Sequence, residues 1–165
     1  MATIAHANSI TRVSTSADFP LGYEVEVPAT SENSSSHTNM GTQVWVYVFN
    51  DDAASLLQGT IVARDAGTTT YDGIVAPADS PTIRVMGVAQ HTIAASSYGF
   101  ILRKGIGEVL ADTGGIGVNL PMVVGNAVNG RADTTGVAAT TYAFGFSTET
   151  VTATNLATCW INCPG

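Results

Sequence analysis

Short stretches in which apolar residues recur at every second position, or fill every position, run along most of the chain and predict β-strands. Residues 23–27 alternate between apolar and acidic side chains and end at Pro28, which is typical of a strand with one exposed face. Residues 44–49 are apolar throughout, which indicates a strand covered on both faces. Further strands are predicted at residues 59–63, 84–89, 98–103, 108–110, 122–124, 142–147 and 157–162.

Helix signals are confined to short regions. Residues 50–59 begin with Asn and Asp, which cap helices, and end at a glycine, so the pattern predicts one or two helical turns there. Residues 77–81, bounded by two prolines, predict a loop with at most a single turn. The sequence therefore predicts an all-β fold, an antiparallel β-sandwich or barrel that is jelly-roll-like, and it leaves barrel and sandwich open.

The pattern divides the chain into two parts. Residues 1–20 show neither the helical nor the strand period and are predicted to form an N-terminal arm, which either orders against a partner or is a frayed end. Residues 21–165 are predicted to form a single β domain. Within that domain, residues 30–39 contain no apolar side chain and predict a long exposed loop.

An internal repeat relates two parts of the predicted domain. Residues 87–95 read GVAQHTIAA and residues 145–153 read GFSTETVTA, at an offset of 58 positions. Each copy precedes a predicted strand, so residues 84–104 and 142–163 are predicted to form two related hairpins in one barrel or sandwich. Chance similarity in a chain rich in Thr, Ala and Gly is the alternative. The glycine that opens each copy is of the kind that marks a bulge or a close approach of another backbone.

Composition narrows the function. The chain has 165 residues, 13 acidic and 6 basic side chains and a net charge of −7, so it lacks the basic clusters that nucleic-acid binding requires. The N-terminus does not resemble a signal peptide and no apolar run approaches the length of a membrane span, so we expect a soluble protein made in a cytoplasm. A positive mean hydropathy with only 12% charged residues favours a component of a larger assembly, in which apolar surface is buried between subunits.

The sequence contains no recognisable catalytic or metal-binding motif. Cys159 and Cys163 are too far apart on a strand to form a disulfide without a sharp bend, and they are predicted to be reduced, partly buried apolar residues. The three histidines and the carboxylates show no metal-binding spacing, and the glycine-rich stretches lack the phosphate-binding pattern. We therefore predict no catalytic residues, no metal, no cofactor and no small-molecule substrate, and hence no enzyme.

Aromatic residues gather on the predicted strands. Trp45, Tyr47 and Phe49 share one face of the strand at 44–49. Such residues pack in cores, but they also dominate the energetics of subunit contacts, so these three are our candidates for a subunit interface. A carbohydrate-binding platform is a third interpretation of an aromatic face. Two further groups are predicted to share faces of their own strands, Tyr98 with Phe100, and Tyr142 with Phe144 and Phe146.

Four short motifs follow one another in a fixed order. They are VMGVAQHTIAASSYGFILRKG at 85–105, VLAD at 109–112, GRAD at 130–133 and FGFSTET at 144–150. Together they resemble the core of capsid decoration proteins, also called cement proteins, of tailed phages, especially the small cyanophage-type head proteins. The resemblance covers about residues 57–163 and does not extend to the first 50 residues. Ser147, where the family more often has Ala, and the loop at residues 30–39 depart from the pattern.

The resemblance implies a structural virion protein that forms homotrimers and binds the major capsid protein on the outside of the assembled head. Such a protein stabilises contacts between capsid subunits and is made in the cytoplasm of the bacterial host, with no nucleic-acid or membrane partner. Within this hypothesis the predicted arm supplies the capsid-contact candidates Ile4, Ile10, Val13 and Phe19. The alternative function is a glycan- or receptor-binding head-fibre or adhesin module. An enzyme acting on glycans is a third hypothesis, for which the sequence nominates no pair of carboxylates.

Overall fold

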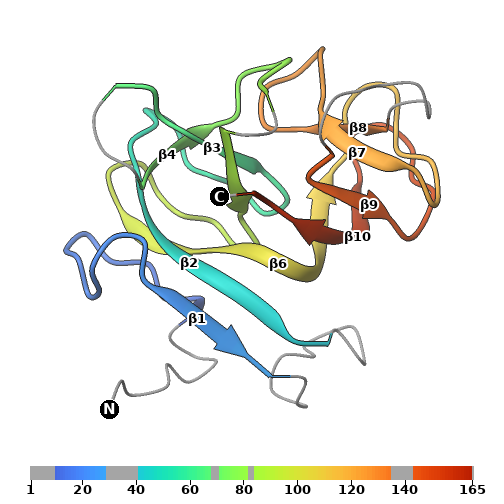
Figure 1. Cartoon of the computed structure of the whole chain (residues 1–165). Helices are drawn as coiled ribbons and strands as arrows, with labels where there is room; N and C mark the ends of the chain where they lie inside the picture. The colour runs from blue at the N-terminus through green and yellow to red at the C-terminus, as the bar shows by residue number, and fades with distance from the viewer. Residues whose placement is uncertain (1–9, 29–40, 68–70, 82–83, 135–142, 165) are drawn as a thin grey trace.

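The computed structural model describes residues 10–28, 41–67, 71–81, 84–134 and 143–164, and over these residues the chain has an all-β fold (Figure 1). The fold class predicted from the sequence is therefore confirmed. The loop predicted at residues 30–39 lies outside the described residues. The strands are β1 (Glu24–Val27), β2 (Gln43–Asn50), β3 (Ile61–Arg64), β4 (Asp72–Val75), β5 (Val85–Val88), β6 (Tyr98–Leu110), β7 (Pro121–Val124), β8 (Ala132–Thr134), β9 (Gly145–Ser147) and β10 (Leu156–Asn162).

Most of these strands lie where the sequence pattern predicts them. The strands predicted at residues 98–103 and 108–110 are parts of one long strand, β6, which bends near Gly105 (φ 120°) without ending. The strands β4 and β8 have no clear pattern because they are short and mix Asp, Gly and Thr with their apolar residues. The loop predicted at residues 77–81 is confirmed.

The helical turns predicted at residues 50–59 are wrong. Asn50 is buried at the end of β2, and its side-chain amide donates hydrogen bonds to the carbonyl oxygens of Ala54 and Ile93, each at 3.0 Å. Leu56 then pairs with Ile93 in an isolated β-bridge. These bonds occupy backbone groups that a helix would need, so the segment bends instead of coiling. Nor do the described residues contain a helix of the length and apolar character that crossing a membrane requires.

The strands close into two small barrels that share β6. In the first barrel the order is β2–β4–β3–β5–β6, and β6 closes it by pairing with β2. The β2–β4 pair is parallel and the other pairs are antiparallel. The second half of β6 begins a second barrel with the order β6–β10–β9–β7–β8, and a bridge between Ala111 and Ala132 brings β8 back to the end of β6. Figure 1 shows β6 running from one barrel into the other.

The two barrels repeat the same pairing pattern. Four pairs of facing residues in the first barrel each have a counterpart pair in the second. Val88–Leu102 corresponds to Phe146–Trp160, and Ile61–Val88 corresponds to Pro121–Phe146. Trp45–Leu102 corresponds to Ile106–Trp160, and Leu56–Ile93 corresponds to Ile116–Val151. Each residue lies 58–61 positions before its counterpart. The two related hairpins predicted from the sequence are therefore confirmed, but they belong to two barrels rather than one. The repeat extends over both barrels, residues 43–103 and 104–163.

Gly87 and Gly145, which open the two copies of the sequence repeat, lie against a neighbouring backbone. A Cβ atom added to Gly87 would come within 2.7 Å of the carbonyl oxygen of Leu102, and one added to Gly145 would collide with the carbonyl oxygen of Trp160. Because Leu102 and Trp160 are themselves repeat counterparts, both barrels need the same close contact between strands. The close approach predicted for these glycines is confirmed.

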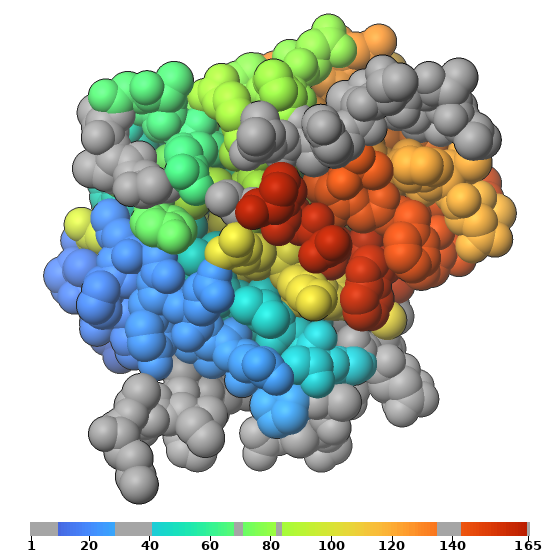
Figure 2. All heavy atoms as spheres, viewed as in Figure 1, coloured from blue at the N-terminus to red at the C-terminus, as the bar shows by residue number. Residues whose placement is uncertain are grey.

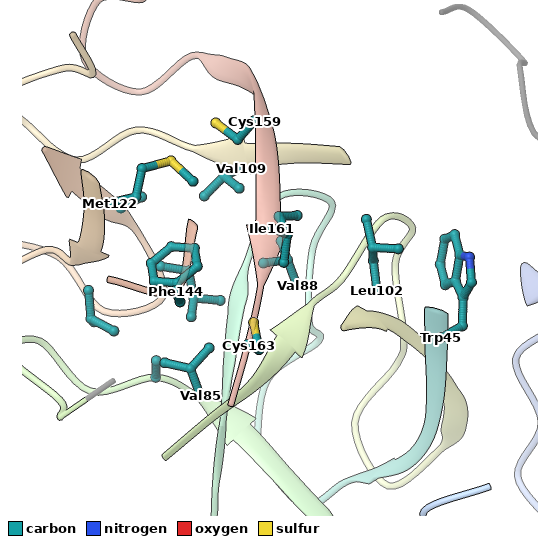
Figure 3. Packing of buried hydrophobic residues seen from close by; sticks show 14 of the residues in the cluster. Trp45, Val85, Val88, Leu102, Val109, Met122, Phe144, Cys159, Ile161 and Cys163 are labelled. Carbon is teal, nitrogen blue, oxygen red and sulfur yellow. The ribbon is translucent and has the colours of Figure 1, made fainter. Parts of the chain in front are cut away.

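Two apolar clusters form the core. A larger cluster joins the interior of the second barrel to the outer face of the first, and Figure 3 shows Val88 of the first barrel beside Ile161 of the second. The outer face of the first barrel is thus buried where the barrels meet. The smaller cluster fills the first barrel and consists of Val46, Val48, Leu56, Val62, Met86, Ala89, Ile93 and Ile101.

Candidate functional site on the outer faces of the barrels

The aromatic residues predicted at a subunit interface lie on the outer face of β2, where the chain itself covers them. Trp45 and Tyr47 are only 7% and 2% exposed, and Phe49 is partly exposed. The Tyr47 ring packs against Phe100, with ring centroids 4.9 Å apart. The Tyr47 hydroxyl accepts a hydrogen bond of 3.0 Å from the backbone N–H of Asp18. These side chains therefore serve the chain's own core, and their part in a subunit contact stays a prediction.

The described part of the predicted arm packs against the first barrel, as the blue residues of Figure 2 show. Ile10 is buried in the larger cluster, and Val13 packs against the smaller one. Phe19 stacks on Tyr23, with centroids 5.2 Å apart and the ring planes 6° from parallel. Ile4 lies outside the described residues. A contact of these four candidates with a capsid shell stays a prediction.

The outer face of the second barrel carries an exposed row of apolar residues. Phe146 of β9 is 47% exposed and stacks on Trp160 of β10, with ring centroids 6.4 Å apart. Trp160 lies opposite Ile106 of β6, and Phe146 lies opposite Pro121 of β7. Pro121 is exposed, and Ile106 and Trp160 are partly exposed. We call these four residues the apolar row; it crosses four neighbouring strands.

The same four positions of the first barrel are buried. They are held by Trp45, Leu102, Val88 and Ile61, each at most 7% exposed. Leu102 there packs over Gly107 in the second half of β6, and Val88 lies beside Ile161 (Figure 3). The repeat thus places one apolar row in the core, with its central residues Leu102 and Val88 against the second barrel, and places the counterpart row at the surface.

The shared face predicted for Phe144 and Phe146 is wrong. Phe144 is fully buried, whereas Phe146 is exposed. Met86, the repeat counterpart of Phe144, lies at the register shift between β3 and β5. A shift of this kind adds a residue to one strand and breaks the alternation of faces, so the Met86 side chain turns into the first barrel, and Phe144 is likewise buried inside the second. Tyr142, the third member of the predicted group, lies outside the described residues.

Buried carboxylates have structural partners. Among the described residues, no three His, Cys, Asp or Glu side chains come together in a way that could hold a metal ion. Asp112 is buried, and its carboxylate accepts hydrogen bonds from the backbone N–H groups of Thr113 and Ala127 at 2.8 and 2.9 Å. Burial acts to raise the pKa of Asp112, but these donors and the nearby charge of Arg131 outweigh it and hold the pKa below its ordinary value.

The two cysteine thiols and the ring nitrogens of His91 are also buried. Cys159 and Cys163 are free, as predicted, but they are fully buried rather than partly buried, and burial raises the pKa of each thiol to about 12. His91 has both ring nitrogens buried with no hydrogen-bond partner among the described residues, and burial lowers its pKa. A buried thiol of this pKa is a poor nucleophile, so neither cysteine is a candidate for catalysis.

Comparison with known proteins identifies a likeness in fold. No protein-family model matches the chain, and no curated protein matches it in sequence. Among solved structures, the chain is similar to the head fiber gp8.5 N base in bacteriophage phi29, with a TM-score of 0.53 and 17% sequence identity. The match covers 72% of this chain and 94% of the other, which is more of this chain than one barrel supplies. The chain therefore shares the fold of a phage head-fibre base over parts of both barrels.

Proposed function

We propose that this chain is a structural protein of a bacteriophage head, and specifically a capsid decoration, or cement, protein. The observation that carries the proposal is the fold likeness to a head-fibre base over parts of both barrels. The motif resemblance between residues 85 and 150 leads to the same class of protein by a separate route. The proposed partner is the major capsid protein on the outside of the assembled head, and the proposed site of synthesis is the cytoplasm of the bacterial host.

The proposed mechanism is multivalent attachment. A homotrimer that touches several capsid subunits makes each further contact intramolecular, so modest individual contacts add up to tight binding. A closed cyclic oligomer also presents identical surfaces to neighbouring subunits of a symmetric shell. The protein would then hold capsid subunits together without any catalytic step.

A second candidate function is a glycan- or receptor-binding head-fibre module. The observation that favours it is the stack of Phe146 on Trp160, which exposes aromatic rings at the surface. Such rings can stack on the apolar face of a sugar. The solved structure with a similar fold is itself described as a head-fibre base.

Co-sedimentation with undecorated capsids tests the first function. We expect the protein to pellet with bare capsids, to saturate, and to stay in the supernatant when the capsids are already decorated. The same sample in a glycan-binding screen should give no signal. A protein that ignores bare capsids would overturn the decoration proposal, and specific glycan binding lost in Trp160→Ala would establish the second function instead.

A further inference from the structure

We propose that the apolar row of Ile106, Trp160, Phe146 and Pro121 is the surface through which one copy of this chain binds a second copy. The inference rests on the proposed function in one respect, because it gives the proposed oligomer a contact surface. It moves that contact from β2, where Trp45 and Tyr47 are covered by the chain itself, to the outer face of the second barrel.

The exposure of the row favours a contact. Phe146 is one of three large apolar side chains that are exposed among the described residues, and it stacks on Trp160 in the neighbouring strand. Ile106 and Pro121 extend the surface to both sides, so four strands present one continuous apolar strip. Aromatic anchors in such strips supply most of the binding free energy at protein interfaces.

The internal repeat indicates what kind of partner binds the apolar row. In the first barrel the two central positions of this row pack against the second barrel, with Leu102 over Gly107 and Val88 beside Ile161. This surface of the barrel is therefore already used, within one chain, to contact another barrel of the same fold. The row on the second barrel has the same place in the fold, and a barrel from a second copy is the matching occupant.

The charges beside the row suit contact between identical chains. Lys104, Ile106 and Glu108 alternate along β6, and they lie opposite Asn162, Trp160 and Thr158 of β10. Lys104 is exposed on one side of the row, and Glu108, partly exposed, lies on the other side. Two copies that each carry a net charge of −7 repel each other in most orientations. On this face, however, Lys104 and Glu108 of one copy can lie near the opposite charges of the second copy.

Native mass measured by light scattering across a concentration series, without capsids, tests the proposal. We expect wild-type protein to be oligomeric and Phe146→Thr to raise the dissociation constant roughly tenfold or more, as loss of an aromatic anchor does. The matched control is Leu57→Thr, which removes an apolar side chain that is 56% exposed but lies in a loop of the first barrel, and it should leave the mass unchanged. A monomeric wild-type protein, or a Phe146→Thr variant as oligomeric as wild type, would overturn the proposal.

Tryptophan fluorescence tests the contact in the unaltered chain, so it does not depend on a variant folding. The chain has two tryptophans: Trp45 is buried, and Trp160 is in the row. On dilution through the dissociation range, we expect the emission of wild-type protein to shift to the red as Trp160 meets water. Trp160→Phe should lose this shift while Trp45 still reports a folded core. Dissociation without a shift would place the contact elsewhere.

The two proposals fail separately. An oligomer that dissociates through the row but does not pellet with capsids would retain this inference and remove the decoration function. A monomer that saturates bare capsids would do the opposite.

Discussion

Ser96 and Thr154 occupy equivalent positions of the two repeats, and both hold their backbone in the left-handed region, with φ of 53° and 65°. The backbone N–H of Ser96 donates to the carbonyl oxygen of Asn50, and that of Thr154 donates to the carbonyl oxygen of Ala111. Asn50 and Ala111 are repeat counterparts, so the strained turn makes the same hydrogen bond in both barrels. Neither residue is a glycine, although glycine adopts this conformation at least cost.

Thr154→Gly should stabilise the protein. Thr154 is exposed, and a β-branched residue at positive φ costs more than the conformational entropy that glycine adds to the unfolded chain. We expect urea unfolding to show a gain of about 0.5–1 kcal/mol in the free energy of unfolding. Ala153→Gly, one residue earlier with no positive φ to relieve, should instead lose about 0.5–1 kcal/mol. Equal changes in the free energy of unfolding for the two substitutions would contradict backbone strain at Thr154.

Gly145→Ala should destabilise the second barrel. The new methyl group would collide with the carbonyl oxygen of Trp160, which belongs to the neighbouring strand and cannot move without breaking its pairing. Overpacking of this kind costs about 1–3 kcal/mol, which chemical denaturation would measure. The control is Gly114→Ala, whose new atom meets only ordinary contacts with Asp133 at 3.6 Å and should change stability little.

The stability of the fold should decrease as the pH falls below about 6.5 because of His91. Burial lowers the pKa of His91 from its ordinary value of 6.5, so the folded protein keeps the imidazole neutral while the unfolded chain takes up a proton. The stabilisation of the fold by neutral His91 is complete above the pKa of this residue in the unfolded chain, and it is lost as the pH falls through the lower pKa of the folded protein. The free energy of unfolding, measured from pH 8 to pH 5, should fall more steeply for wild type than for His91→Gln. Parallel profiles would show that His91 ionises freely in the fold.

Cys159 and Cys163 should resist thiol reagents in the folded protein. With a pKa of about 12 for each thiol, about one molecule in ten thousand carries the reactive thiolate at pH 8. We expect titration with a chromogenic disulfide to detect no thiols in the native state and both in guanidinium chloride. Labelling of native protein at the rate of a free cysteine would show that the second barrel opens around β10.

The strands were predictable because their side-chain pattern repeats every two residues, and the hairpins because Gly87 and Gly145 open similar segments. The helical turns predicted at residues 50–59 failed because the Asn50 side chain bonds to distant carbonyl groups, such as that of Ile93. Capping residues and buried bend residues have the same composition, so a local pattern does not distinguish them.

The candidate surface was beyond sequence reasoning for a different reason. Leu102 and Trp160 are repeat counterparts, both apolar and both central in their rows, but Leu102 is buried and Trp160 is partly exposed. Which of them is covered depends on the neighbouring barrel, a contact between distant parts of the chain. The aromatic residues of β2 were picked out because they occupy every second position of one strand, whereas the apolar row takes one residue from each of four strands.

The shared strand β6 ties the two barrels into one mechanical unit. Its first half closes one barrel against β2, and its second half carries the hydrogen bonds of β10. If either barrel opens, the other loses the strand that completes its wall, so we expect no state in which one barrel is unfolded and the other intact. A pull on either end of the chain would therefore be borne by the whole molecule until it yields in a single step.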